Sequence, residues 1–367
     1  MVFTKGCVAR FTFCHRWDKG FRQIPPEKVI GRIRYLMERY NVGFIQFCDE
    51  NFGSDRKATE ELIRLIKPLD ILWQVAGVRA CTLDLDFLRA MHDAGCVALY
   101  YGFESGSPEI LEVMEKKLEL QHNLKAARWT HEANLFTIYQ LILGMPGETP
   151  ATIADTIEMV KQITEFLPEP PYQRLSINYI QALPGTPVYE YARAKAFIGA
   201  GLEDEEAYLL SISDIDAGDD TKFINFTAYP YLTVQSWRHR LLYESTVHWI
   251  RARRKRNMPA QPVEANRFKS YKRGGYFNLH EVAHHPIVLE MVYPVRGVLI
   301  WVWTLISVYR RSKRREFIAH VMEMMTWRFG KRDPLSDCRS LRHVMRDMKP
   351  EAGTPSEQSM MPLRLGR

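Results

Sequence analysis

Hydrophobic and polar positions follow two alternating periods along the first half of the chain. Six short runs rich in β-branched and aromatic residues are typical of strands, and they lie at residues 2–4, 44–48, 72–79, 97–103, 136–143 and 175–181. The segments between them repeat apolar positions with the helical period, at residues 26–40, 58–67, 85–94, 108–115, 122–133 and 150–166. Strict strand–helix alternation predicts an α/β fold with a parallel sheet and right-handed crossovers. The continuous apolar character of residues 97–103 and 138–144 predicts strands covered on both faces.

Glycines, cysteines and charged residues gather at the downstream ends of these runs. The clusters occupy residues 6–14, 49–52, 79–82, 102–106, 144–149 and 182–187. In α/β barrels the carboxyl ends of the strands carry the active site, because the loops after the strands meet there. We therefore expect the chemistry of this protein at one rim of the sheet.

The alternation stops after about residue 200, which indicates a second kind of organisation. The expected divisions are a barrel over residues 1–195, an irregular connector over 196–232, a helical and basic C-terminal region over 233–349 and a disordered tail over 350–367. Within the third division, the pattern predicts helices over residues 233–256 and 281–327 and a loop between them.

Composition and charge narrow the class of protein. With 46% hydrophobic and 25% charged residues among 367, disorder of the whole chain is excluded. The net charge of +7 is uneven, since residues 235–273 hold eleven basic and two acidic side chains. A local basic stretch favours a phosphate-bearing partner or an anionic membrane over a general nucleic-acid coat, so a nucleic-acid partner is not expected. A solvated helix face is the alternative.

Cysteine usage and apolar runs indicate the compartment. Six cysteines in a chain of this length do not form a disulfide framework, and the N-terminus lacks the pattern of a secretory signal. We therefore expect a reducing, cytoplasmic environment. The longest uncharged apolar run covers residues 297–309, shorter than the ~20 residues that span a bilayer, so no spanning helix is expected.

The loop after the first run holds two cysteines, Cys7 and Cys14. Two thiols at this spacing are compatible with a metal or cluster site, but in isolation the spacing is a weak signal and favours incidental cysteines. The surrounding motifs change this interpretation.

Five motifs in order resemble those of radical S-adenosylmethionine (SAM) enzymes, especially the branch whose members usually carry an N-terminal cobalamin-binding domain. Residues 6–19 are similar to the cluster loop, and residues 47–56, 102–111, 143–149 and 182–192 resemble the motifs of the second, fourth, fifth and sixth strands of that branch. The resemblance covers residues 1–195. It implies a partial, laterally open (β/α)6 barrel of the TIM type, followed by a mostly helical C-terminal region.

The resemblance also implies a 4Fe-4S cluster held by three thiolates in a Cys-x3-Cys-x2-Cys loop. Here Cys7 and Cys14 take the first and third positions, and Phe11, which cannot ligate iron, takes the middle one. Three alternatives follow: a degenerate homologue, an error or engineered change in the sequence, or a substitute ligand. Cys48 and Cys81, at the ends of the second and third strands, are the candidate substitutes, and thiols packed as small hydrophobic groups are the alternative for each.

The fourth-strand motif supplies the first group of expected SAM contacts. By resemblance, Gly102, Glu104 and Ser105 contact SAM. A carboxylate and a hydroxyl at a strand end can bind ribose hydroxyls or an ammonium group, and glycine permits a close backbone approach. Capping of the following helix is the alternative role of these polar side chains.

The other expected SAM contacts come from three separate loops. Gly144 and Pro146 form a turn that would bend beneath a flat ligand, or that only starts the following helix. By resemblance, Phe13 would lie against the adenine. Asp49, next to Glu50, is an acid expected at the rim in the SAM site, and a structural pair with Arg79 or Lys19 is the alternative.

Two features lie outside the expected barrel. His280, His284 and His285 include a pair at helical spacing, but no third ligand follows at a useful distance, so a metal site is not expected. Residues 286–315 combine an apolar run, two tryptophans and a basic end, which is typical of an interfacial membrane anchor. A buried core helix with a solvated end is the alternative. The anchor would add peripheral contact at the inner membrane face to the cytoplasmic location.

The function that the resemblance implies is reductive cleavage of SAM to methionine and a 5′-deoxyadenosyl radical. Methyl transfer or rearrangement would follow on a small-molecule or lipid-like substrate, with flavodoxin or ferredoxin as reductant. The catalytic residues beyond the cofactor ligands are not identified. The competing hypothesis is a non-catalytic binding or scaffold protein with the same barrel, which Phe11 favours.

Cobalamin is expected only from another chain. The resemblance begins at the first strand, and no Asp-x-His-x-x-Gly motif is found. A separate cobalamin-binding subunit, a truncated descendant of a longer protein or a misplaced start are the interpretations we consider.

Overall fold

The computed structural model describes residues 1–15, 20–213, 217–219, 221–256 and 291–329. The strands are β1 (Thr4–Cys7), β2 (Gly20–Gln23), β3 (Phe44–Phe52), β4 (Leu72–Val78), β5 (Cys96–Glu104), β6 (Phe136–Leu143) and β7 (Leu175–Tyr179). The α-helices are α1 (Pro26–Tyr40), α2 (Arg56–Ile66), α3 (Leu85–Asp93), α4 (Pro108–Val113), α5 (Leu120–Glu132), α6 (Pro150–Thr164), α7 (Pro187–Ala194), α8 (Leu202–Ser213), α9 (Tyr231–Lys255), α12 (Arg296–Arg311) and α13 (Arg314–Phe329). Short 3-10 helices cover Lys67–Leu69, Pro171–Gln173 and Tyr293–Val295.

Five parallel strands form the main sheet, in the order β3-β4-β5-β6-β7. Neighbouring strands are consecutive in the parallel sheet, so each connection crosses over through helical segments, as the alternation of periods predicts. The predicted α/β fold with a parallel sheet and a helical C-terminal region is therefore confirmed.

The first predicted strand lies beside β3, outside the hydrogen-bonded ladder of the main sheet. The Cys48 amide donates to the Met1 carbonyl at 2.9 Å, and the Met1 amino group donates to the Gln46 carbonyl at 2.6 Å. β1 then pairs antiparallel with β2, an element that the sequence pattern does not predict because its four residues alternate without an apolar run.

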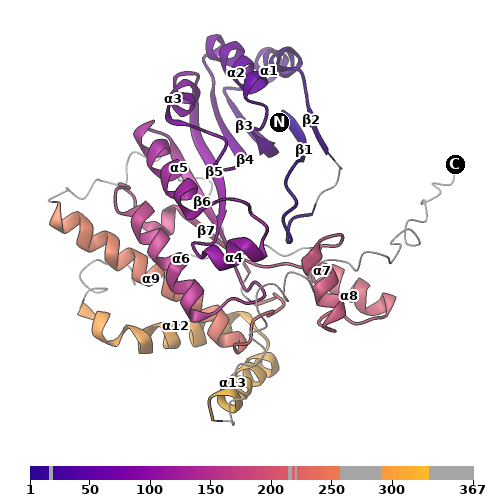
Figure 1. The fold of residues 1–367 in the computed structure, drawn as a ribbon, viewed down its shortest axis with the longest axis vertical. Helices are drawn as coiled ribbons and strands as arrows, with labels where there is room; N and C mark the ends of the chain where they lie inside the picture. The colour runs from indigo at the N-terminus through magenta and orange to yellow at the C-terminus, as the bar shows by residue number, and fades with distance from the viewer. Residues whose placement is uncertain (16–19, 214–216, 220, 257–290, 330–367) are drawn as a thin grey trace.

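The two faces of the main sheet differ in burial. Phe47, Val75 and Leu99 are fully buried and share one face in register with each other. On the opposite face Gln74 and Ala98 are buried. Most other side chains of that face are partly buried or exposed; they include Gln46, Cys48, Glu50, Tyr100, Gln140, Ser176 and Asn178. The expectation of strands covered on both faces is therefore wrong for most of this second face, although it holds at Gln74 and Ala98. Figure 1 shows α3, α5 and α6 along one side of the sheet and the β1–β2 hairpin on the other.

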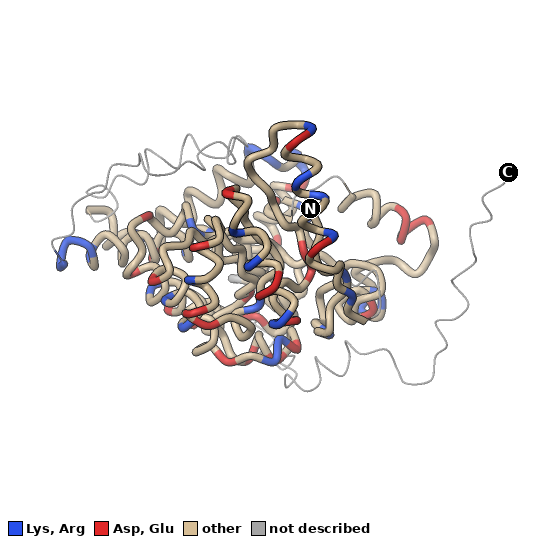
Figure 2. The backbone as a smooth tube through the Cα atoms, turned by 90° about the horizontal axis from the view of Figure 1, so that it is seen from above, with Lys and Arg blue, Asp and Glu red and all other residues tan. Residues whose placement is uncertain are grey.

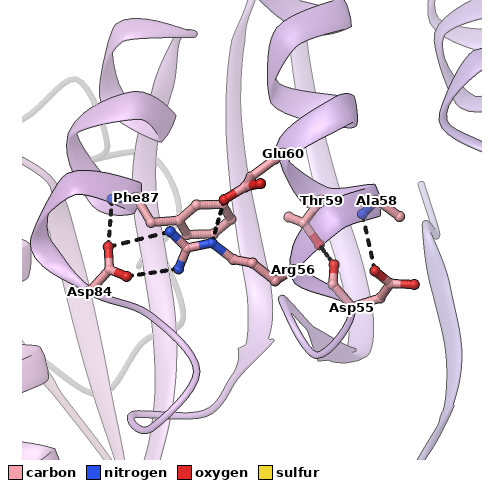
Figure 3. A network of polar contacts seen from close by, with 7 residues as sticks. All are labelled: Asp55, Arg56, Ala58, Thr59, Glu60, Asp84 and Phe87. Atoms are coloured by element: carbon pink, nitrogen blue, oxygen red, sulfur yellow. Dashed lines mark hydrogen bonds and ion pairs between the residues drawn. The ribbon is translucent and has the colours of Figure 1, made fainter.

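Local side-chain chemistry determines where the outer helices begin. Asp55 caps α2 by accepting from the Ala58 amide at 3.0 Å, and Asp84 caps α3 by accepting from the Phe87 amide at 2.9 Å. Arg56 connects the two helices, since its guanidinium donates to Asp84 at 2.9 Å and lies 4.0 Å from the centre of the Phe87 ring (Figure 3). These contacts fix the outer layer at one end of the sheet.

The C-terminal region packs against the barrel through α9, which confirms the helix predicted over residues 233–256. α9 lies against α6, and α12 lies against α9, where Thr304 hydrogen-bonds His239 at 3.1 Å. Figure 2 shows basic residues gathered at the C-terminal end of α9. The expectation of an irregular connector is wrong over residues 202–213, which form α8: the acidic first turn of α8 starts a helix despite its weak apolar pattern.

Some sequence predictions fall outside the described residues. They include the loop at 257–280, the histidines 280, 284 and 285, and the tail from residue 350. Among the helices that are described, none combines the length and the apolar character needed to cross a bilayer.

Candidate functional site

The loop that holds Cys7 and Cys14 is anchored at the carboxyl edge of the sheet by Thr12. The Thr12 hydroxyl donates to the Val113 carbonyl at 2.8 Å, and its amide donates to the Met114 carbonyl at 3.1 Å. Thr12 itself is 2% exposed. The end of α4 therefore holds the loop against the rim, as expected from the position of the motif.

Electrostatic coupling shows which groups surround the Cys14 thiol. Desolvation raises the pKa of Cys14, the nearby Cys7 raises it further, and Lys116 lowers it. Glu104 and Glu50 also raise this pKa. The structure thus brings the two loop cysteines together with the acids of β3 and β5 that the sequence placed at the rim.

A buried ion pair lies at the centre of this cluster. The Lys116 ammonium donates to the Glu104 carboxylate at 2.7 Å, and the two residues are 4% and 7% exposed. Gly102 makes room for the pair, because a Cβ at that position would lie 2.3 Å from Glu104 Oε1 and 3.2 Å from Lys116 Nζ. Burial of both partners makes this pair sensitive to the loss of either one.

The backbone around the pair is held in rarely populated conformations. Glu104 has a φ of 61°, and the residues on both sides of Lys116, Glu115 and Lys117, have φ of 50° and 49°. Left-handed conformations of non-glycine residues cluster at ligand sites. Sequence reasoning missed Lys116, because nothing in the pattern distinguishes it from the adjacent lysine.

Phe11 lies against this ion pair instead of providing a metal ligand. Its ring centre is 4.4 Å from Lys116 Nζ and 5.6 Å from the Arg79 guanidinium, and the ring stacks on Phe13 with 5.8 Å between centroids. Cations on an aromatic face are stabilised by the ring quadrupole. The position that the resemblance reserves for a thiolate is therefore occupied by an aromatic ring that contacts two cations.

Ser105 and Asp49 are engaged within the protein. The Ser105 hydroxyl lies 3.1 Å from the Thr156 hydroxyl of α6. Asp49 accepts hydrogen bonds from the Phe3 amide at 2.8 Å and from the Thr4 amide and hydroxyl. Burial raises the pKa of Asp49, and these hydrogen bonds oppose the increase. Asp49 joins the first strand to β3, and a pair between Asp49 and Arg79 does not form.

The loop after β6 is organised by a buried carboxyl group that the sequence analysis did not select. Glu148 accepts from the Gly144 amide at 2.5 Å, and Gly144 has a φ of 88°. Burial raises the pKa of Glu148 to about 8, although hydrogen bonds from the Gly144 and Met145 amides lower it. Gly144 and Pro146 are both buried, so the buried Glu148 side chain stabilises this turn from inside the protein.

The donor set does not fit a cluster bound by three thiolates. Cys48 is exposed on β3, and Cys81 is exposed in a hollow of about 270 Å³ that Asp84, His122 and Trp129 also line. Within the described part of the chain, no three histidine, cysteine or acidic side chains gather as a metal site. Neither candidate substitute is brought to Cys7 and Cys14. The buried Glu104 carboxylate, in contrast, fits an ammonium ligand, since it already accepts a hydrogen bond from the Lys116 ammonium.

A family model matches the first part of the chain. The family model of the Radical SAM superfamily matches residues 1–160. This match to residues 1–160 agrees with the resemblance carried by the five motifs.

Relatives by sequence include methyltransferases and cyclases. An uncharacterized methyltransferase of Pyrococcus horikoshii is 30% identical over 204 residues, which cover 53% of this chain and 42% of the relative. The anaerobic magnesium-protoporphyrin IX monomethyl ester cyclase of Cereibacter sphaeroides is 30% identical over 162 residues, 42% of this chain and 26% of the cyclase. The hopanoid C-2 methylase of Rhodopseudomonas palustris is 28% identical over 206 residues, 51% of this chain and 36% of the methylase. The chain spans less than half the length of these relatives.

A solved structure agrees with the fold. The cobalamin-dependent S-adenosylmethionine radical enzyme OxsB superimposes with a TM-score of 0.50 at 14% identity, over 95% of this chain and 52% of OxsB. The likeness extends beyond the barrel into the helical C-terminal region.

Proposed function

We propose that this chain binds SAM at the rim of its radical SAM domain and acts as a radical SAM-type enzyme. The buried Glu104–Lys116 pair beside the Cys7–Cys14 loop is the observation that carries the proposal. The methyltransferase, methylase and cyclase relatives support methyl transfer or rearrangement as the reaction class. The substrate would be a small or lipid-like molecule.

The charges of the Glu104–Lys116 pair are complementary to those at the amino-acid end of SAM. That end carries one ammonium and one carboxylate, the same two charges as Lys116 and Glu104. On binding, the SAM ammonium would take the place of Lys116 on Glu104, and the freed Lys116 would bind the SAM carboxylate. This exchange leaves no buried charge unpaired, which is the condition for stable burial of ionic groups. Phe13, Gly144 and Pro146 would then contact the adenosyl part.

Cys7 and Cys14 would supply two thiolates of the cluster that radical SAM enzymes use to cleave SAM. Because Phe11 occupies the middle position, the loop offers no third thiolate. Cobalamin, where it is used, would come from a separate subunit, and a flavodoxin or ferredoxin would supply electrons.

SAM binding tests the proposal directly by titration calorimetry on the purified full chain. Lys116→Met should weaken SAM affinity at least tenfold. The matched control is Lys161→Met, which removes a partly exposed lysine paired with Glu244 at 3.7 Å, away from the rim. Equal loss in both variants, or no SAM binding by the wild type, would contradict the proposal.

Anaerobic reconstitution tests the cluster separately. Iron and sulfide per chain should be low in the wild type and approach four irons only in Phe11→Cys, with an electron paramagnetic resonance signal that SAM shifts. Cluster assembly in the wild type would show that a ligand outside the three-thiolate set exists. Failure of both proteins to assemble one would favour the non-catalytic alternative.

A second proposal concerns the C-terminal helices, which would bring the protein to the cytoplasmic face of an anionic membrane. α12 buries one side against α9 but exposes an apolar stripe on the other, with Val298, Val302 and Ile306 at 65%, 46% and 52% exposed. Residues 291–315 contain six basic side chains and no acidic one. Apolar surface beside clustered Lys and Arg fits the interface of an anionic bilayer.

Vesicle sedimentation tests this second proposal. The full chain should sediment with phosphatidylserine-containing vesicles and much less with neutral ones, and Val298→Glu/Val302→Glu should reduce binding several-fold. Leu202→Glu/Leu210→Glu, which changes two exposed leucines of α8, is the control. Equal binding by all three proteins would refute an anchor on α12.

A further inference from the structure

Two polar side chains at the rim lack the partners that buried polar groups normally have. Arg79 follows β4, and its Nε is shielded from solvent with no hydrogen-bond partner. Asn51, near the end of β3, is 0% exposed, and both its Nδ2 and Oδ1 lack partners. Unsatisfied buried polar atoms are rare in native proteins and cost free energy, so each of them requires an explanation.

These two side chains come from neighbouring strand ends. Phe52 and Val78 are register partners in the β3–β4 pair. Asn51 precedes Phe52, and Arg79 follows Val78. The unpartnered amide and the unpartnered guanidinium therefore belong to one short stretch of the rim, at the carboxyl ends of two paired strands.

Phe11 supplies the surface on which the guanidinium rests. The distance from the Arg79 guanidinium carbon to the centre of the Phe11 ring is 5.6 Å. Stacking on an aromatic ring orients an arginine while leaving its N–H groups available for a ligand. Among the described residues, no carboxylate forms an ion pair with Arg79, unlike Lys116, which is already neutralised by Glu104.

We infer that Arg79 and Asn51, with Phe11 beneath the guanidinium, form a binding site for a carboxylate or phosphate group of a ligand. An oxyanion would accept hydrogen bonds from Arg79 Nε and Asn51 Nδ2, the donors without partners, and Arg79 favours planar, bidentate contacts with such groups. The replacement of a thiolate by Phe11 thus has a positive role, because a cysteine could not orient the guanidinium in this way.

The inference deepens the proposed function and rests on it for the nature of the ligand. Two sources of the oxyanion share this chemistry: the carboxylate of SAM itself, or an acidic group on the second substrate. In the first case Arg79 adds to Lys116 at the amino-acid end of SAM. In the second, the enzyme selects acidic substrates.

The Nε–H signal of Arg79 in ¹⁵N-labelled full-length protein reports binding directly, and its absence from Arg79→Lys assigns it. In the first arm, SAM should move the signal and 5′-methylthioadenosine, which lacks the amino-acid end, should not. In the second arm, inorganic phosphate or acetate should move it in protein saturated with SAM, while chloride at equal ionic strength should not. A response in the first arm alone identifies the SAM carboxylate, and a response in the second identifies an acidic substrate. No response in either arm overturns the inference.

Variants separate binding from folding. Asn51→Asp places a negative charge in the proposed site and should weaken the affinity for the responding anion at least tenfold. Asn51→Leu should weaken it similarly without lowering the melting temperature, because the amide has no partner to lose. The control is Arg32→Gln, since Arg32 also rests on an aromatic ring, 4.9 Å from the centre of Tyr35 on α1. Unchanged anion affinity in both Asn51 variants would refute the site.

Calorimetry distinguishes this inference from the proposed function. SAM binding without any response of Arg79 would refute only the oxyanion site. A response of Arg79 to phosphate in a protein that does not bind SAM would refute the proposed function and leave the oxyanion site intact.

Discussion

The Glu104–Lys116 pair makes a quantitative prediction about stability. Lys116→Met removes the ammonium but leaves the Glu104 carboxylate buried beside apolar rings. With 2.7 Å between the paired atoms, the attraction at an effective dielectric constant of 20 is about 6 kcal/mol before desolvation. Loss of one partner of a buried pair costs about 3–5 kcal/mol, since the remaining charge has no compensation. The cation–π contact of Lys116 with Phe11 adds about 1 kcal/mol.

Urea unfolding of four proteins measures this effect. The wild type, Lys116→Met, Glu104→Gln and the double variant form a thermodynamic cycle. Each single variant should lose about 3–5 kcal/mol of unfolding free energy, and the double variant should lose less than the sum. The surface pair of Arg56 with Asp84, whose side chains are 41% and 52% exposed, is the control, and its cycle should give a coupling of about 0–1 kcal/mol.

The refuting result is a Lys116→Met variant within 1 kcal/mol of the wild type, with the same denaturant slope. That result would mean that water reaches Glu104, and that the pair behaves like the surface control. SAM would then find no buried pair with which to exchange charges.

Three further predictions follow from the rim. Gly102→Ala should displace the Glu104–Lys116 pair, because its Cβ would lie 2.3 Å from Glu104 Oε1. Calorimetry should show weaker SAM binding and a lower melting temperature, and an unchanged SAM affinity would contradict this prediction. Asp49→Asn should lose about 1–3 kcal/mol of unfolding free energy, since it weakens the hydrogen bonds that hold the first strand on β3, and a loss below 0.5 kcal/mol would disprove that role. Glu148 has a folded-state pKa raised from 4.5 to about 8, so the folded protein retains a proton that the unfolded chain releases. Stability should fall as pH rises from about 4.5 to 8, and Glu148→Gln, which stays neutral, should flatten that decline in urea titrations at several pH values.

How much of the site the sequence could predict depends on the kind of interaction. Cys7, Cys14, Glu104 and Glu50 were expected at one rim because carboxyl ends of parallel strands converge, and the electrostatic coupling of Cys14 shows this convergence. Lys116 could not be selected, because its burial depends on a turn with two left-handed residues that no local pattern encodes. The sequence also could not predict that Asn51 and Arg79 have side-chain atoms without hydrogen-bond partners, since the surrounding tertiary structure determines which partners are available.

The sequence alone determined the alternation of strands and helices, the parallel character of the sheet and the motifs at the strand ends that resemble the radical SAM family. Those features are local, because period, capping and turn residues act within a few positions. Only the tertiary structure decided what Phe11 contacts, which face of the sheet is open, and which polar groups at the rim have partners. These depend on side chains more than sixty residues apart in sequence, such as Phe11 with Arg79 and Lys116, and only packing brings such residues together.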